Sequence, residues 1–501
     1  MEETRLLLEE KIAYHRKCLR QLLLQRNELV PVSKLPPEIL ARIFSFVSAR
    51  RTRSSPIFPC YNFTHVSYSW RSVALNTPNL WAVLPQGRRW RREMLERSKG
   101  TGLVVRSVLA NDSARRLLFL KEVFTKHTSR IRELLLSQIT AKSLATLFQD
   151  LRPSSLRLEG LELTNAVKGS PTFPADLLDT EVLRLLRVTN CDGPWYSLSL
   201  PALLFLKLHK IANRPPFTKF LEMLRGLPAL RYLDLDDSLP SENDAVGQFG
   251  VVNLSQLRSL SLASSSNQKE VTNILSLIIV PSTTTLKFVA GRDFTFQESD
   301  SILDEMSSSF STFFSHFQQG EYRSVYVAST RVGHLHLKAW KYNELNSTAD
   351  LDLELCIHDR ENQMLDRIFP SLPLLDITAL TLDGSTHCSL PFGHFPNLRN
   401  IKIVRDCIVN FVKFLAWKPD NYDTEPSTDY GVPLPALQSL WIHKCSLRWE
   451  VLEELQDCLM DRCERRAGFL KLKLTECLQI SGRDVESLRE IVSDVKWDGL
   501  Q

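Results

Sequence analysis

Apolar residues recur along most of the chain in one pattern, apolar-x-x-apolar-x-apolar. Three copies are clear, at Leu203/Leu206/Leu208, Leu230/Leu233/Leu235 and Leu257/Leu260/Leu262, and successive copies are 27 residues apart. Looser copies stand at Ile131/Leu134/Leu136, Leu158/Leu161/Leu163, Leu183/Leu186/Val188, Thr283/Leu286/Phe288, Val332/Leu335/Leu337, Ile377/Leu380/Leu382, Leu398/Ile401/Ile403, Leu437/Leu440/Ile442 and Phe469/Leu472/Leu474. The alternation at the end of each copy predicts a short strand whose apolar residues all point to one side.

The spacing between copies is typical of leucine-rich repeats, in which each copy supplies one short parallel strand. One such unit cannot bury its own apolar side, so neighbouring units must stack. Cys191, Cys445 and Cys477, with Ala166 in another copy, stand three residues after the last apolar position. In leucine-rich repeats this turn position takes Asn or Cys. We therefore predict an α/β fold for residues 86–501, an irregular leucine-rich-repeat-like solenoid of short parallel strands with helices on its convex side.

Two stretches interrupt the repeats, and we expect insertions near 300–330 and 418–435. Residues 300–319 predict a longer helix, whose apolar residues lie mostly on one face: Ile302, Met306, Phe310, Phe313, Phe314 and Phe317. Residues 418–435 are polar, acidic and proline-rich, which indicates a projecting loop.

The first 30 residues predict an amphipathic helix, with no Gly or Pro to interrupt it. Its stripe follows alternating four- and three-residue steps through Leu8, Ile12, His15, Leu19, Leu22, Arg26 and Leu29. His15 and Arg26 on this stripe argue against a stable coiled coil. We expect the helix to pack against the domain that follows it or against the first repeat.

Residues 31–85 predict a small helical domain. Leu35-Pro36-Pro37-Glu38 is typical of a helix start, since proline is favoured in the first turn and Glu38 suits the positive end of the helix dipole. One predicted apolar face follows, formed by Ile39, Leu40, Ile43, Phe44 and Val47, and a second is formed by Val66, Trp70, Val73 and Ala74. From periodicity alone, the simplest interpretation is a bundle whose apolar faces form its own core.

The same residues resemble an F-box. The resemblance rests on Leu35 to Leu40 with Ile43-Phe44, on Val66 to Ala74 around Trp70, and on Thr77-Pro78-Asn79-Leu80-Trp81. It is closest to the F-boxes found in large protein families of mushroom-type fungi. Two departures are a long, basic loop at Ser48–Asn62 and Tyr68-Ser69 in place of a basic pair before the tryptophan.

In that family the F-box binds a Skp-type adaptor, which links it to a cullin–RING ubiquitin ligase. The resemblance implies that a helical face lies in an apolar groove of the adaptor, and that its contacts are Leu35, Pro36, Ile39, Leu40, Ile43 and Phe44, with Val66 and Trp70 shaping the second helix. The chain would then be the non-catalytic substrate receptor of an SCF-type ligase. An interaction scaffold that recruits no cullin is the alternative, because the Ser48–Asn62 loop could block the adaptor.

Composition excludes several other classes of protein. The net charge of +5 over 501 residues does not indicate nucleic-acid binding. The most apolar run, Ile274–Val280, is too short to span a bilayer, and the N-terminus does not resemble a signal peptide. Ten cysteines scattered singly favour reduced thiols, and hence the cytoplasm or nucleus.

Motifs for catalysis or for cofactors are missing from the sequence. There is no phosphate-binding GxxxxGK[ST], no GxSxG and no HExxH. Cys458 and Cys463 have the wrong spacing for a metal pair. We therefore predict no enzyme activity, no cofactor and no metal. Arg88–Arg92, with Trp90 at its centre, leaves RNA binding as a third possibility beside a simple solvated helix face.

The unknown target protein is expected on the concave side of the repeats, which is lined by residues between the inward leucines. The candidate target-binding residues are Tyr232, Asp234, Arg258, Arg399, Lys402 and Trp441, on a surface that also includes Lys207, Ser259, Ser261 and Ser439. Tyr, Trp and Arg most often carry interface energy. A merely solvated sheet face is the alternative.

Overall fold

The computed structural model describes residues 2–49, 59–84, 90–109, 114–149, 156–165, 169, 171–173, 181–193, 196, 199–240, 250–265, 268–290, 299–317, 322–330, 334–342, 347–356, 367–384, 395–405, 407–416, 433–465 and 471–500. The chain divides into two compact units, Met1–Arg187 and Val188–Gln501. No helix within the described ranges is long and apolar enough to cross a membrane.

The first unit begins with helices. They are α1 (Glu2–Glu28), the 3-10 turn η1 (Pro31–Lys34), α2 (Pro37–Ala49), α3 (Pro59–Phe63), α4 (Tyr68–Leu75) and the 3-10 turn η2 (Pro78–Trp81). No residue of α1 is buried, and Leu8, Leu19 and Leu22 on its predicted stripe are exposed. The prediction that this helix packs against the next domain or the first repeat is therefore wrong.

A parallel sheet completes the first unit. Its elements are β1 (Val83–Leu84), α5 (Arg91–Arg97), β2 (Leu103–Val108), α6 (Ala114–His127), η4 (Thr128–Arg130), β3 (Ile131–Ser137), α7 (Ala141–Phe148) and β4 (Gly160–Thr164). β1 pairs with β2, β2 with β3 and β3 with β4, always in parallel. Side chains alternate between buried and half-exposed along β2, as the repeat pattern predicts for strands with one buried face. β5 (Leu185–Thr189) spans the boundary between the two units.

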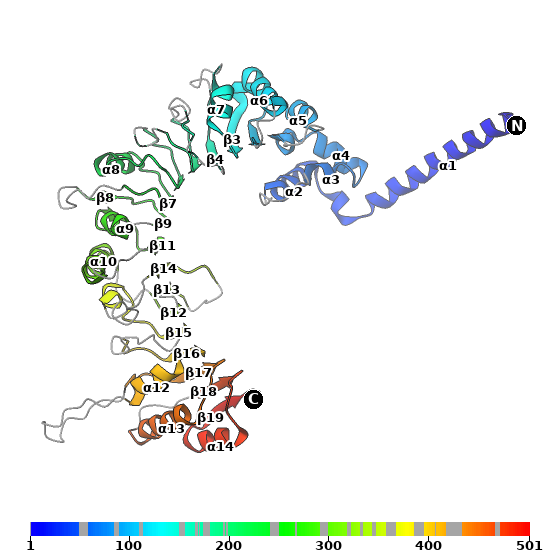
Figure 1. The fold of residues 1–501 in the computed structure, drawn as a ribbon. Coiled ribbons are helices and arrows are strands. Elements are labelled where there is room, and N and C mark those ends of the chain that lie inside the picture. Colours follow the sequence, from blue (N-terminus) through cyan, green and yellow to red (C-terminus); the bar gives the residue numbers. More distant parts are fainter. Residues whose placement is uncertain are drawn as a thin grey trace. The chain divides into compact units, whose positions relative to one another are not determined.

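The second unit continues with parallel strands and helices. Its first elements are β6 (Phe205–His209), α8 (Phe217–Arg225), β7 (Tyr232–Asp236), β8 (Val252–Asn253), β9 (Ser259–Ser264), α9 (Gln268–Leu275), β10 (Ile278–Ile279) and β11 (Thr285–Ala290). β6, β7, β9 and β11 are parallel neighbours, while β8 and β10 form a separate pair. In this unit α8, α9 and α10 lie on one side of the strands (Figure 1). We call the other side of these strands the open face.

The strand order is inverted in the middle of the second unit. After α10 (Ser299–Phe314) come β12 (Ser324–Thr330), β13 (His334–Trp340), β14 (Leu351–Cys356), η9 (Phe369–Ser371) and β15 (Ala379–Gly384). β14, not β12, lies parallel to β11, β13 is antiparallel to both β14 and β12, and β12 lies parallel to β15. The predicted copy at Val332/Leu335/Leu337 is therefore not a repeat strand, because Leu335 and Leu337 belong to the antiparallel β13. Val332 lies outside the described residues.

The predicted inserted helix is confirmed by α10. Met306, Phe310, Phe313, Phe314 and Phe317 are all buried. The Phe313 ring packs against Phe288 of β11 with 5.8 Å between ring centroids. The side chain of Ile302, which belongs to the same prediction, is not described.

The C-terminal part returns to regular repeats. Its elements are β16 (Asn400–Arg405), α12 (Ile408–Ala416), β17 (Ser439–His443), α13 (Trp449–Glu464), β18 (Lys471–Thr475), α14 (Gly482–Ile491) and β19 (Asp494–Trp497). β15 to β19 pair in chain order, and all these pairs are parallel. The residues of the predicted loop from 418 to 432 and Ala166 lie outside the described ranges.

Several strands end in the same turn, which explains the cysteines. The residue after the strand has a positive φ although it is not glycine, as at Lys444 (56°) and Glu476 (51°). The next residue points into the core, so Cys445 and Cys477 are fully buried. Their thiols donate to the carbonyls of His443 (3.4 Å) and Thr475 (3.5 Å). The same buried place is occupied by Ile139, Cys191, Ile211 and Ser238.

Candidate functional site

The core of the small helical domain is an aromatic cluster. The Phe44 ring of α2 stacks on Phe63 of α3 with 4.2 Å between centroids, and lies 4.9 Å from the Trp70 ring of α4. Phe44 is 0% exposed and Leu40 is 2% exposed. Both were predicted to contact an adaptor. In this structure both side chains are buried inside the domain. Trp70 is half-buried in the same cluster, so it holds the second helix in place.

A different set of apolar residues on α2 faces solvent. Ile39 (43%), Ile43 (42%), Phe46 (62%) and Val47 (46%) are exposed to these fractions. Their spacing of four, three and one residues places them on one side of the helix. We call this set the α2 stripe. The structure therefore divides the predicted single apolar face into a core face and a solvent-facing stripe.

The other predicted adaptor contacts lie around the start of the helices. Pro36 is exposed and Leu35 is half-buried just before α2. Val66 is 56% exposed just before α4. The next residue, Ser67, caps α4, because its hydroxyl accepts the Trp70 backbone N–H at 3.1 Å. Leu35, Pro36, Ile39, Ile43 and Val66 thus remain accessible to a partner.

The basic cluster after this domain takes part in internal packing. The buried Arg91 guanidinium lies 4.6 Å from the centroid of the Phe119 ring. The Trp90 ring lies 4.9 Å from that of Tyr61. Residues 88 and 89 lie outside the described ranges. Both contacts favour the interpretation of a packed helix start over an RNA-binding surface.

On the open face of the second unit, outward residues of neighbouring strands are in register. They form a row that we call the central row: Lys207, Asp234, Ser261, Lys287, Asp352, Lys338, Tyr326, Thr381, Lys402, Trp441, Lys473 and Lys496. The predicted residues Asp234, Lys402 and Trp441 all belong to it. Tyr232 lies in the adjacent row on β7, 41% exposed, with its ring 5.7 Å from that of Phe205.

Arg258 and Arg399 are placed differently from the other predicted target-binding residues. Each is exposed and stands one residue before its strand, β9 or β16. Their backbone N–H groups donate to the carbonyls of Arg231 (2.8 Å) and Thr378 (2.9 Å), which fixes the start of the strand. They therefore lie at the margin of the open face and not in its rows.

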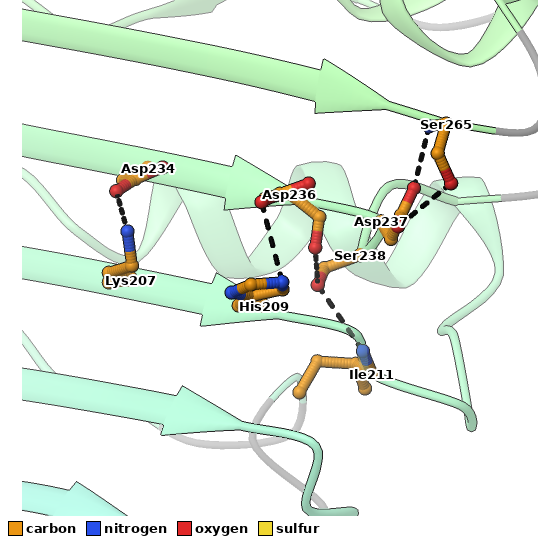
Figure 2. A network of polar contacts seen from close by, with 8 residues as sticks. All are labelled: Lys207, His209, Ile211, Asp234, Asp236, Asp237, Ser238 and Ser265. Carbon is orange, nitrogen blue, oxygen red and sulfur yellow. Dashed lines mark hydrogen bonds and ion pairs between the residues drawn. The ribbon is translucent and has the colours of Figure 1, made fainter. Parts of the chain in front are cut away.

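Charges at the β6–β7 end of the open face are paired with each other, as Figure 2 shows. Lys207 makes an ion pair with Asp234, and His209 Nε2 lies 3.4 Å from Asp236 Oδ2. Burial raises the pKa of Asp236, the charge of His209 opposes this, and the charges of Asp237 and Asp234 raise it further. Asp237 accepts hydrogen bonds from the Ser265 N–H (2.7 Å) and hydroxyl (2.9 Å). Lys207 and Asp234 therefore neutralise each other, while Asp236 and Asp237 make polar contacts within the sheet.

The middle of the central row is also paired internally. His336 Nε2 lies 2.6 Å from Asp352 Oδ1. Burial would raise the pKa of Asp352, but the hydrogen bond and charge of His336 outweigh it and hold this pKa below its ordinary value. Tyr326 donates its hydroxyl to Asp383 at 3.0 Å, and burial together with that carboxylate raises the pKa of Tyr326 to about 12. Arg405 Nε lies 3.3 Å from the same Asp383.

The C-terminal end of the central row is different. Lys402 Nζ lies 3.8 Å from the centroid of the Trp441 ring, and Lys473 Nζ lies 4.0 Å from it. Trp441 Nε1 donates to the Thr475 hydroxyl at 2.7 Å, and that hydroxyl is 3.0 Å from His443 Nδ1. Burial lowers the pKa of Lys402, and the positive charges of Lys473 and Lys444 lower it further, while the negative charge of Asp383 opposes this. We call Lys402, Trp441, Lys473 and Lys496 the lysine–tryptophan row.

Sequence reasoning found half of this row. Lys402 and Trp441 were predicted, but Lys473 and Lys496 were missed. Lys473 stands between Leu472 and Leu474 of a recognised copy, so the same rule could have found it. Lys496 lies between Val495 and Trp497 of β19, which carries no leucine pattern. Across the described residues, no group of three or more His, Cys, Asp or Glu side chains could hold a metal ion.

Comparison with known protein families identifies one part of the chain. Residues 32–84 match the F-box-like family, so the chain carries an F-box-like domain there. Among solved structures, a leucine-rich-repeat protein of Leptospira interrogans is similar over 85% of this chain and 98% of that chain, with 14% identity and a TM-score of 0.33. No curated protein matches the sequence. An F-box-like domain followed by a leucine-rich-repeat-like sheet is an architecture typical of non-catalytic adaptor proteins.

Proposed function

We propose that this chain is the substrate receptor of an SCF-type cullin–RING ubiquitin ligase. In this role the F-box-like domain binds a Skp-type adaptor, and the open face of the repeats binds the target protein. The observation that carries the proposal is the α2 stripe, because it leaves four large apolar side chains in solvent within a domain whose family generally binds such adaptors. Exposed apolar patches of this kind mark interaction sites.

The division of α2 into two faces supports the proposed mode of binding. Phe44 packs against α3 and α4, and Leu40 is buried on the same face of α2, so the α2 stripe is presented by a rigid element. A helix presented in this way can lie in an apolar groove of the partner. We assign the adaptor contact to Leu35, Pro36, Ile39, Ile43 and Val66, and extend it to Phe46 and Val47. Catalysis would then belong to the other ligase subunits.

The proposal also includes the group of organisms and the cellular compartment that were inferred from the sequence. The F-box residues most resemble those of mushroom-type fungi, and the scattered single cysteines suit the reducing cytoplasm or nucleus.

The test is recovery of adaptor and cullin with an epitope-tagged full-length chain. Ile39→Asp with Ile43→Asp places two charges in the proposed apolar contact, where an unpaired buried charge is strongly unfavourable. We expect recovery of both partners to be lost while the F-box-like domain stays folded. Leu118→Asp is the matched control, since Leu118 is also exposed (65%) but belongs to α6. Unchanged recovery with the double variant would contradict the assigned contact.

The same experiment separates the receptor from a plain interaction scaffold. Mass spectrometry of the native pull-down should find cullin and RING subunits with the wild-type chain. A chain that captures other proteins but never brings these subunits would be a scaffold, and the receptor proposal would fail.

A further inference from the structure

The lysine–tryptophan row carries three positive charges on described residues that make no ion pair, although the carboxylate of Asp383 acts on Lys402 from a distance. Within the described part of the chain, Lys402, Lys473 and Lys496 make no ion pair, whereas Lys207 of the same row is paired with Asp234. Lys473 and Lys496 stand directly opposite each other on β18 and β19. Like charges in that relation are destabilising. These three lysines therefore do not stabilise the sheet through one another.

Trp441 holds two of these ammonium groups in place. β16 and β18 flank β17 on its two sides, so Lys402 and Lys473 approach the indole ring from different neighbours. The hydrogen bond from Trp441 Nε1 to Thr475 fixes the ring between them. A cation over an aromatic face gains electrostatic energy but keeps its charge. The result is a set of oriented positive charges on a rigid part of the open face.

The geometry points to an acidic protein segment as the partner of this row. We propose that strands β16–β19 bind, on the open face, a target segment rich in Asp and Glu, with its carboxylates on Lys402, Lys473 and Lys496. Neighbouring strands lie about 4.8 Å apart, and alternate side chains of an extended peptide repeat every 6.6–6.8 Å or so. An extended segment that runs across β16–β19 with carboxylates at alternate positions can therefore reach all three lysines.

Two observations favour carboxylates over other anions. Single-stranded nucleic acids bind by stacking bases on open aromatic faces, and the Trp441 ring is already covered by two ammonium groups. Phosphate recognition typically relies on Arg clusters with bidentate hydrogen bonds, and the three cations of the row are all lysines. Arg405, at the end of β16, is engaged with Asp383.

This inference rests on the proposed function, since it names the class of target that the open face would capture. Its test is nevertheless independent of the ligase. The probe is a fluorescent peptide of alternating Glu and Ser, mixed with the purified full-length chain and followed by anisotropy. A peptide of alternating Gln and Ser, a phosphoserine peptide of equal net charge and an oligouridine are the comparison probes.

The variants remove charge without removing packing. Lys402→Gln with Lys473→Gln should weaken binding of the Glu–Ser peptide by between roughly two- and thirty-fold, as expected for losing two ion pairs at or near the surface. Lys402→Arg with Lys473→Arg should keep most of the affinity. Lys413→Gln, at an exposed lysine on helix α12 and not on the open face, is the matched control and should bind like the wild type. Binding should also weaken as salt is raised, because screening shortens the reach of surface charges.

Three results would overturn the inference. They are equal binding of the Glu–Ser and Gln–Ser peptides, unchanged binding in the double Gln variant, and tighter binding of the phosphoserine peptide or oligouridine than of the Glu–Ser peptide. If adaptor recovery persists while the acidic peptide fails to bind, the receptor proposal stands and this inference fails. If the peptide binds but no cullin is recovered, the reverse holds.

Discussion

The packing of α2 makes a sharp prediction about two neighbouring residues. Phe44 is 0% exposed and contacts two aromatic rings, whereas Ile43 beside it is 42% exposed on the α2 stripe. Phe44→Ala should therefore unfold the F-box-like domain, and the loss of adaptor binding should follow from unfolding. Ile43→Ala should weaken adaptor binding in a domain that stays folded.

The expected losses of folding free energy differ clearly between Phe44→Ala and Ile43→Ala. Truncating a buried Phe to Ala costs about 3–5 kcal/mol, and the stacked contact with Phe63 places this site toward the upper end. At about 0.05–0.15 kcal/mol per residue, a domain the size of residues 32–84 has only about 3–8 kcal/mol of stability in total. Truncating the half-exposed Ile43 to Ala should lower the folding free energy by about 1 kcal/mol or less.

Hydrogen–deuterium exchange of the full-length chain measures this directly, because it reports local unfolding of one domain while the other stays folded. Peptides from α2 and α4 should lose protection in Phe44→Ala and keep it in Ile43→Ala, and peptides from β16–β18 should be unchanged in both. Full protection in Phe44→Ala together with lost adaptor binding would refute the reasoning, since it would make Phe44 a contact residue and not a core residue.

Three further predictions test other parts of the structure. Removal of residues 2–28 should change the free energy of unfolding of the remaining chain by less than about 0.5 kcal/mol in a denaturant titration, since no residue of α1 is buried. Asp352→Asn should flatten the acid limb of the stability profile: the pKa of Asp352 is lowered in the folded state, so its contribution is present above about pH 4, its unfolded pKa, and is lost as pH falls through the folded pKa. Iodoacetamide should alkylate the exposed Cys463 of the native protein and spare the buried Cys445 and Cys477, as mass spectrometry of the labelled peptides would show.

The repeat strands could be predicted because their signal is local. Leu233 and Leu235 alternate with exposed residues and are 1% and 0% exposed in β7, as a strand with one buried face requires. The cysteine turns could be predicted for the same reason. Ser238 and Ile211 fill the same buried position without a distinctive residue type, so the sequence alone could not identify those turns.

The faces of α2 could not be assigned from the sequence. Ile39 and Ile43 form one stripe and Leu40 and Phe44 form another, about 100° away around the helix, and both stripes have valid helical spacing. A core surface and a partner surface are both apolar, so residue type does not distinguish them. Only the position of Phe63 and Trp70, which arrive from other helices, shows which stripe is buried.

The order of the strands decides which charged residues of the central row are neighbours, and this order could not be predicted from the sequence. Lys287 stands opposite Asp352 because β11 pairs with β14. A sequence interpretation that places strands in chain order would put the residues of β12 there instead. Alternating apolar residues, such as Leu335 and Leu337, look alike in a parallel and an antiparallel strand. The neighbours of a charge on the open face therefore follow from strand order, which local patterns do not encode.

The inverted segment also explains how the second unit remains parallel on both sides of it. Three strands in an antiparallel meander reverse direction twice, so β14 can run with β11 and β12 can run with β15. Two strands would leave one flank antiparallel.

The inverted order requires the chain to cross two strands before β12 and two again after β14. These crossings meet on the helix side, where Arg367 contacts Asp304 of α10 at 3.1 Å and its carbonyl accepts the Ser307 hydroxyl at 2.9 Å. The long apolar helix α10 thus packs over the strands where the two connections cross. On the other side of these strands, the central row of the open face continues across the inversion without a break in register.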